Sequence, residues 1–370
     1  MQTIDVLNAR ERLVLSLRAL YEGCGYVRFP MRRFEEYAFY LENKSFLTSE
    51  SVLSFTNANG RLMALKPDVT LSIVKRAHAG SEGVEKLYYH ESVYRVAATD
   101  HEFTEIEQIG VELLGDIDLY GTGEVLRLAI ESLRGTGLAY VLDVSHMGFA
   151  GGLMAAAGLE GERREAAFRL VRHKNAHELR AMLLAWQVAP FYAERIAALP
   201  TLAGSVPETL KRAADLAVGQ EMTQAIGELS KLYGVLEALG LQACVRLDFS
   251  ILNDLDYYSG LVFQGYASGA PRAVLSGGRY DPLMRKLGKQ GGGLGFALYL
   301  DELKHALAVP CEYDADVLAL YCAQDSAAAV LAAAETLRAS GLRVLTATRA
   351  PQGLRARKIM RFTGAGFDSL

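Results

Sequence analysis

Residues 86–115 of the chain read KLYYHESVYRVAATDHEFTEIEQIGVELLG and contain two long runs rich in β-branched and aromatic residues. The first run covers residues 86–98 and the second covers residues 102–115, with a charged turn at residues 99–101 between them. Such runs, joined by a short polar turn, are typical of two antiparallel strands. We therefore expect a long two-stranded unit here, and we interpret the rest of the chain around it.

The sequence on both sides of this unit mixes helical and strand-like patterns. Residues 5–25 carry leucines at helical spacing, and residues 70–77 and 119–133 also favour helices. Residues 57–60 read Asn-Ala-Asn-Gly, and Asn-Gly is the strongest short signal for a hairpin. Residues 139–148 resemble a strand. Hairpins mixed with helices indicate an α+β core.

Two segments differ from this core in composition. Residues 151–240 are rich in Ala, Leu, Arg and Glu and predict an α-helical insertion. The glycine-rich run 291–295 is interpreted as leading into a helix at 296–307. We expect a core domain over residues 1–305 that contains the insertion. Residues 306–370 show one strand-helix-strand unit and predict a truncated α/β C-terminal domain.

Composition places the chain among ordinary globular proteins. Of its 370 residues, 51% are hydrophobic and 22% are charged, which excludes a disordered chain. The net charge of −4 gives no electrostatic footprint of a nucleic-acid binder, and no apolar run is long enough to span a membrane. Cys24, Cys244, Cys311 and Cys322 have no metal-type spacing, and no signal-peptide pattern is visible. We expect a cytoplasmic protein without cofactor or metal.

Two clusters carry groups that can bind a small molecule, and each has a structural alternative. Arg95, Gln108 and Glu112 on the paired strands fit a carboxylate, an amide-like edge and an ammonium, or else form a solvated face with ion pairs. Tyr257 and Tyr258 are adjacent, so on a strand one ring lies in the core and the other lines a pocket. The alternative is that both tyrosines serve packing only.

Two further patterns are weaker. Gly277 and Gly278, with the run 291–295, permit close approach of a ligand but match neither a dinucleotide-binding nor a phosphate-binding loop. His173 and His177 have the spacing of a zinc pair on one helix, yet no third ligand accompanies them. A solvent-facing histidine pair is the simpler interpretation, and the sequence predicts no metal centre.

The order of the segments resembles a known family. The resemblance runs from about residue 5 to residue 305 and implies the class II aminoacyl-tRNA synthetase fold, an antiparallel sheet flanked by helices. The expected fold class is therefore α+β with this sheet. Five segments follow one another as in the catalytic core of histidyl-tRNA synthetase: GRLMALKPDVT (60–70), the two strands of 86–115, LDYYSGLVF (255–263), SGGRYD (276–281) and GLGFALYLDEL (293–303).

This resemblance implies a histidine pocket. Asp68 and Thr70 match the acid and the hydroxyl that the family uses on the amino group of histidine. Gln108 and Glu112 match its substrate-binding pair, and the two adjacent tyrosines match the pair that closes over the imidazole. No catalytic residue is expected. The predicted histidine-binding residues are Asp68, Thr70, Arg95, Gln108, Glu112, Tyr257 and Tyr258.

Three departures from the synthetase pattern decide the expected activity. Asn253 replaces the arginine that stabilises the activated carboxylate, and Ala97 replaces an acid that reads adenine. The family's third motif ends Gly-Leu-Glu-Arg-Leu, whereas residues 299–303 read Tyr-Leu-Asp-Glu-Leu, so Glu302 replaces an ATP-binding arginine. Loss of one transition-state donor costs a factor of about 10² to 10³ in rate. The sequence therefore predicts a chain that forms no histidyl-adenylate.

A synthetase-like pocket without activation residues resembles the regulatory subunit of ATP phosphoribosyltransferase. Residues 255–266 match that family better than the synthetase, because Gly260 replaces a synthetase arginine. The resemblance implies a non-catalytic subunit in the first step of L-histidine biosynthesis. Such a subunit is required by a short-form catalytic subunit, which carries out phosphoribosyl transfer, and it mediates feedback inhibition by histidine.

The expected partners follow from the same resemblance. They are the short-form catalytic subunit and L-histidine as allosteric ligand, with a homodimeric unit formed near Val27–Pro30 inside a hetero-oligomer. No membrane and no tRNA are expected as partners. Two alternatives stay open: an orphan synthetase paralogue that binds an amino acid in another role, and a divergent histidine-tRNA ligase.

Overall fold

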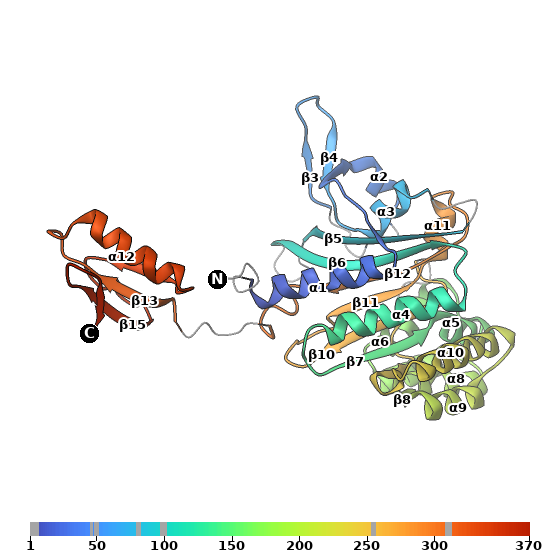
Figure 1. Ribbon diagram of the computed structural model, residues 1–370. Helices are drawn as coiled ribbons and strands as arrows, with labels where there is room; N and C mark the ends of the chain where they lie inside the picture. Colours follow the sequence, from blue (N-terminus) through green and yellow to red (C-terminus); the bar gives the residue numbers. More distant parts are fainter. Residues whose placement is uncertain are drawn as a thin grey trace. The chain divides into compact units, whose positions relative to one another are not determined.

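The protein is described by a computed structural model that covers residues 7–44, 47, 52–78, 83–96, 102–252, 257–307 and 313–370. These residues form two compact units, a larger one within Leu13–Ala306 and a smaller one that includes Leu307–Leu370. Figure 1 shows the elements of both units, and each unit is described by itself.

A nine-stranded sheet is the centre of the larger unit (Figure 1). Its order is β1-β5-β6-β12-β11-β10-β7-β9-β8. The pairs β1–β5 and β7–β9 are parallel, and the other neighbours are antiparallel. The strands are β1 Val27–Arg28, β5 Val84–Val96, β6 Phe103–Gly115, β7 Tyr140–His146, β8 Ala203–Ser205, β9 Val245–Asp248, β10 Leu261–Ala267, β11 Leu275–Arg279 and β12 Gly292–Tyr299.

The two strands predicted at residues 86–115 are β5 and β6, each 13 residues long. They pair along their whole length, from Val84 opposite Gly115 to Val96 opposite Phe103. The expected turn at 99–101 lies outside the described residues. This pair is the longest ladder among the described strands, and it fixes which side chains share a face of the sheet.

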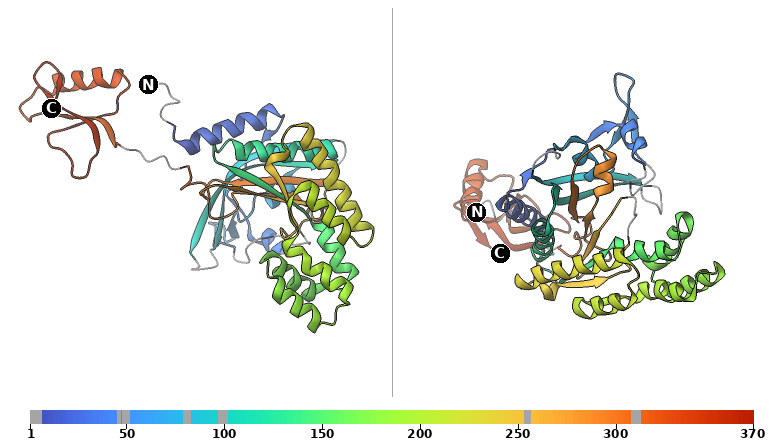
Figure 2. Two further views of the ribbon diagram at one scale, coloured as in Figure 1. Left: turned by 90° about the horizontal axis from the view of Figure 1, so that it is seen from below. Right: turned by 90° about the vertical axis from the view of Figure 1, so that its right-hand side faces the viewer.

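The two faces of β6 carry different side chains. Ile109, Val111 and Leu113 are buried on the face covered by helix α4 (Leu119–Arg134), which also packs on β7, β10 and β12. Helix α1 (Ala9–Gly23) lies beside α4 (Figures 1 and 2). Gln108 and Glu112 point to the opposite face, because successive strand residues alternate.

A small three-stranded sheet, β2-β4-β3, belongs to this opposite side. The hairpin predicted at 57–60 joins β3 (Ser54–Thr56) to β4 (Leu62–Leu65), and β2 (Phe34–Glu36) pairs with β4. Figure 1 shows this hairpin extending away from the main sheet. The short helices of this side are α2 (Tyr37–Glu42), the predicted α3 (Thr70–Arg76), and α11 (Asp281–Lys286), which packs on α3 and β12.

The predicted helical insertion contains one strand. Strand β8 lies among its helices and forms the edge of the main sheet by antiparallel pairing with β9. The expectation of an all-helical segment is therefore wrong at β8, because three residues are too few to show an alternating pattern. The helices are α5 Met147–Ala156, α6 Gly161–Arg172, α7 Ala176–Ala185, α8 Pro190–Ala198, η3 Leu199–Thr201, α9 Val206–Leu216 and α10 Gln220–Ala238, followed by η4 Gln242–Cys244.

His173 and His177 do not share a helix. His173 caps the C-terminus of α6, and His177 lies in α7, whose first turn is capped by the Asn175 side chain. Lys174 between them has a left-handed φ of 53°, which ends α6. The expected placement of both histidines on one helix is wrong because this residue interrupts the helical spacing.

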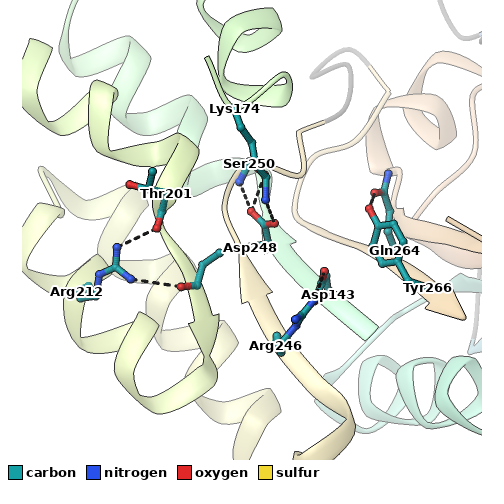
Figure 3. A network of polar contacts seen from close by, with 10 residues as sticks. Asp143, Lys174, Thr201, Arg212, Arg246, Asp248, Ser250, Gln264 and Tyr266 are labelled. Atoms are coloured by element: carbon teal, nitrogen blue, oxygen red, sulfur yellow. Dashed lines mark hydrogen bonds and ion pairs between the residues drawn. The ribbon is translucent and has the colours of Figure 1, made fainter. Parts of the chain in front are cut away.

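A polar network ties the helical segment to the sheet (Figure 3). Lys174 Nζ contacts Asp248 Oδ2 at 2.8 Å at the end of β9. Arg246 of β9 donates two hydrogen bonds to Asp143 of β7, at 2.9 and 3.0 Å. Arg212 of α9 donates to one backbone carbonyl before β8 and to one in its first residue. Ion pairs and backbone pairing therefore act together at this edge.

The helix predicted at 296–307 is wrong, because the glycine-rich run leads into the central strand β12. Leu294, Phe296 and Leu298 alternate with smaller residues and are buried. A central strand with apolar residues on both faces gives a continuous apolar run, which periodicity alone does not distinguish from a buried helix.

The smaller unit contains a four-stranded sheet of order β14-β13-β15-β16. Pairing is parallel except between β15 and β16. The predicted strand-helix-strand unit is β13 (Ala315–Leu320), α12 (Ala327–Ala339) and β14 (Val344–Ala347). Beyond it, β15 (Ala356–Phe362) and β16 (Phe367–Ser369) were not expected, because basic residues hide the apolar alternation of β15.

Among the described residues, no helix is both long and apolar enough to cross a membrane. The same residues contain no cluster of three His, Cys, Asp or Glu side chains placed to hold a metal ion.

The close approach of β6 and β12 makes a stability prediction. A Cβ at Gly110 would lie 1.9 Å from the Phe296 carbonyl oxygen, whereas a Cβ at Gly227 in α10 meets nothing within 4 Å. We expect Gly110→Ala to lower the melting temperature, since overpacking costs about 1–3 kcal/mol. Gly227→Ala should raise it slightly, because alanine is favoured over glycine in a helix by about 1 kcal/mol. Thermal unfolding followed by circular dichroism measures both, and an unchanged Gly110→Ala midpoint would contradict the close approach.

Candidate functional site

A cavity of about 360 Å³ lies on the sheet face opposite α4. Strands β5, β6, β11 and β12 supply its floor, and residues next to α3 and before β10 supply its sides. The structure brings the whole predicted set into this one cavity, although histidine binding itself stays a prediction. The predicted residues that line it are Asp68, Thr70, Arg95, Gln108, Glu112, Tyr257 and Tyr258.

The start of helix α3 holds two of these groups. Asp68 Oδ1 accepts a hydrogen bond from the Leu71 N–H at 2.7 Å, so the carboxyl group caps the first turn. Thr70, the first residue of α3, donates its hydroxyl to Glu112 Oε1 at 2.7 Å. The helix start is thus joined directly to the central strand β6.

The carboxyl groups of buried Glu112 and half-buried Asp68 dominate the electrostatics of the cavity. Glu112 is 1% exposed and also accepts a hydrogen bond from the Tyr280 hydroxyl at 2.5 Å. Burial raises the pKa of Glu112 to about 8, against the opposing hydrogen bonds from Tyr280 and Thr70. Burial also raises the pKa of Asp68, although a backbone hydrogen bond and the charge of Arg95 oppose it. A bound cation would lower the pKa of both carboxyl groups, because it stabilises their charged form.

Arg95 is the one cation among the described residues that line the cavity. Its Nε donates to the Pro67 carbonyl at 3.1 Å. Gln108 is 4% exposed, and its amide offers both a donor and an acceptor to a ligand. Because Gln108 precedes Glu112 on β6 and Arg95 pairs with Thr104, the cation lies toward the Gln108 end of the cavity.

The paired tyrosines differ from the expectation of opposite faces. Tyr257 and Tyr258 both line the cavity, with ring centroids 4.5 Å apart and ring planes at 47°. They precede β10 and belong to no strand, so the alternation of a strand does not apply to them. The Tyr280 ring lies 6.0 Å from that of Tyr257 and extends the aromatic wall.

The glycine series makes room for this wall. A Cβ at Gly278 would lie 2.7 Å from the Tyr258 ring, and one at Gly293 would lie 2.1 Å from the Tyr280 ring. A Cβ at Gly295 would lie 1.8 Å from a carboxylate oxygen of β6. These glycines belong to β11 and β12, and they admit protein side chains to the sheet surface.

Sequence reasoning missed several cavity residues. Tyr280 belongs to the quoted segment SGGRYD (276–281) but was not chosen as a site residue, and Tyr89 shares the strand face of Arg95 on β5. The period-two pattern of β12 would have indicated Tyr299, but that segment was interpreted as a helix. The missed lining residues with polar or aromatic side chains are Tyr89, Ser276, Tyr280, Phe296 and Tyr299.

The departures from the synthetase pattern lie partly outside the described residues, which include neither Asn253 nor Ala97. Glu302 is described and lies 3.9 Å from Arg272 as an ion pair. It does not line the cavity in the part of the chain that the structure describes.

Comparison with known proteins identifies the family. The family model described as histidyl-tRNA synthetase matches residues 5–303. An ATP phosphoribosyltransferase regulatory subunit from Desulforamulus reducens is 32% identical over 358 residues, which are 93% of this chain and 88% of that protein. The chain belongs to the family of ATP phosphoribosyltransferase regulatory subunits. The resemblance predicted from the sequence is confirmed.

Solved structures agree with this regulatory-subunit family. An ATP phosphoribosyltransferase regulatory subunit/histidyl-tRNA synthetase from Bacillus halodurans C is 26% identical with a TM-score of 0.75, covering 91% of this chain and 88% of that chain. A chain of the ATP phosphoribosyl transferase (HisG:HisZ) complex from Thermotoga maritima is 19% identical with a TM-score of 0.62, covering 79% and 97%, and shows the shared fold alone. The predicted α+β, class II synthetase-like fold is confirmed.

The raised pKa of Glu112 makes a prediction for the ligand-free protein. From its ordinary 4.5 up to about 8, the folded state holds a proton that the unfolded state has released. The contribution of Glu112 to stability therefore falls as pH rises through this window. Glu112→Gln has no such proton. We therefore expect the melting temperature of the variant to increase relative to that of the wild type as pH rises from about 5 to about 8. Parallel pH profiles of the two proteins would contradict the pKa of about 8.

Proposed function

We propose that this chain is a non-catalytic subunit of a hetero-oligomeric ATP phosphoribosyltransferase in the first step of L-histidine biosynthesis. A short-form catalytic partner requires it for activity, and L-histidine inhibits the complex through it. Its family membership supports this proposal, as does its fold similarity to a chain of the Thermotoga maritima complex.

The observation that carries the proposal is one cavity that combines the carboxyl groups of Asp68 and Glu112, one cation and an aromatic wall. An ammonium fits against Asp68 and Thr70. An imidazole N–H fits against Glu112, with the adjacent tyrosines flanking the ring. A carboxylate then lies toward Gln108 and Arg95. These are the three polar parts of free histidine, held in one continuous space.

The electrostatics argue against adenylate formation at this site. The described lining residues supply two carboxyl groups and a single cation, Arg95. A triphosphate needs several cations or a metal to balance its charge. Glu302, in the place of the synthetase's ATP-binding arginine, pairs with Arg272 and supplies no further cation. We infer that phosphoribosyl transfer belongs wholly to the partner subunit.

The expected homodimeric unit is part of the same proposal. Strand β1 lies at one edge of the main sheet, and its Val27 side chain is 65% exposed. An edge strand offers unpaired backbone groups as well as this apolar side chain. The segment Val27–Pro30 is thus suited to meet a second copy of the chain.

Reconstitution with the short-form catalytic subunit of the same organism tests the proposal. We expect formation of phosphoribosyl-ATP from ATP and phosphoribosyl pyrophosphate to depend on this chain and to fall when L-histidine is added. No complex and no effect on activity would favour the orphan paralogue. Histidine-dependent exchange of pyrophosphate into ATP by the chain alone would favour the ligase.

The variant Asp68→Asn tests whether this cavity is the histidine sensor. Asparagine keeps an oxygen that can accept the Leu71 N–H and removes the charge. A charge-assisted hydrogen bond is worth about 1.5–3 kcal/mol, so we expect the half-inhibitory histidine concentration to rise about tenfold or more. Activation of the partner should persist. The matched control Asp215→Asn, at an exposed residue of α9, should change neither property. Unchanged inhibition of Asp68→Asn would place the sensor elsewhere.

A further inference from the structure

Strand β12 presents side chains of increasing size along the cavity. Its residues on the cavity face are Gly295, Ala297 and Tyr299. The register sets Gly295 opposite Glu112 and Tyr299 opposite Gln108. Side-chain size therefore increases from none, through a methyl group, to a phenol within this stretch of strand. At one end the Glu112 carboxylate takes the place of a β12 side chain, and at the Gln108 end β12 supplies the aromatic ring of Tyr299.

Tyr299 is held firmly at the walled end. Its backbone N–H donates to the Val274 carbonyl at 2.8 Å, and the following Leu300 N–H donates to the Glu107 carbonyl at 2.9 Å. Burial raises the pKa of the Tyr299 phenol, and the nearby charge of Arg95 opposes this shift. The ring therefore lies next to the cation of the cavity, on backbone fixed from both sides.

We propose that Tyr299 is a specificity-determining residue that restricts the cavity to free amino acids. This inference rests on the proposed function, in which the ligand carboxylate lies toward Arg95. A ligand extended beyond its carboxyl carbon, as an amide, an ester or a mixed anhydride with a nucleotide, needs the volume that the ring occupies. Displacing a packed ring is unfavourable, so Tyr299 weakens the binding of such ligands and leaves the binding of free histidine unchanged. The residue at this place in the synthetase motif is glycine, which has no side chain.

Calorimetric titration of the full chain with L-histidine and with L-histidine benzylamide tests this role of Tyr299. The proteins are the wild type, Tyr299→Gly and Tyr299→Phe. The benzylamide lacks the carboxylate charge in every titration, so that loss cancels when proteins are compared. We expect Tyr299→Gly to lower the preference for histidine over the benzylamide by about tenfold or more. Tyr299→Phe should keep the wild-type preference, because the ring remains.

Folding of each variant is checked by its circular dichroism melting curve, and Tyr299→Ala replaces the glycine variant if that one does not fold. An unchanged preference in the folded small-residue variant overturns the inference and leaves histidine binding intact. A preference lost equally in Tyr299→Phe also overturns it, because the hydroxyl and not the ring volume would then discriminate. Failure of the wild type to bind L-histidine at all overturns the proposed function, and this inference with it.

Discussion

The burial of Glu112 constrains the residues around it in the cavity. A carboxyl group that is 1% exposed on a central strand needs hydrogen-bond donors to offset its lost hydration. Thr70 supplies one from the start of α3, and Tyr280 supplies another from the end of β11. The neighbouring strand must also carry no side chain at Gly295, since a Cβ would lie 1.8 Å from the carboxylate. One side chain thus fixes a helix start, a strand end and a glycine.

The seven predicted site residues could be identified from the sequence because they lie on segments whose order is distinctive. All seven line one cavity, although they come from a helix start, two long strands and the loop before β10. Tyr299 was missed for a physical reason. A central strand buried on both faces loses the alternation of polar and apolar residues that marks a half-buried strand. Once β12 is known to be a strand, Gly295 and Tyr299 fall on the cavity face together.

The other misses have a similar origin in tertiary structure. Strand β8 is three residues long and forms because it pairs with β9. This pairing leaves no recognisable pattern in the local sequence. Strand β15 forms because it pairs with β13 and β16, although basic residues dominate its sequence. His173 and His177 are separated by the left-handed Lys174, whose amino group is held by Asp248 from a distant strand. In each place the partner that decides the conformation is remote in the chain.

Strand β8 also limits how the helical segment can move. It anchors the helices around it to the main sheet through its pairing with β9, and the Lys174–Asp248 contact reinforces that edge. Swinging these helices outward as a hinged flap would break both connections. Inward from β8, the order is β9, β7 and then β10, which begins shortly after Tyr258. The loop that carries Tyr258 and the helices around β8 are therefore connected through neighbouring hydrogen-bonded strands of one sheet, and not through a free hinge.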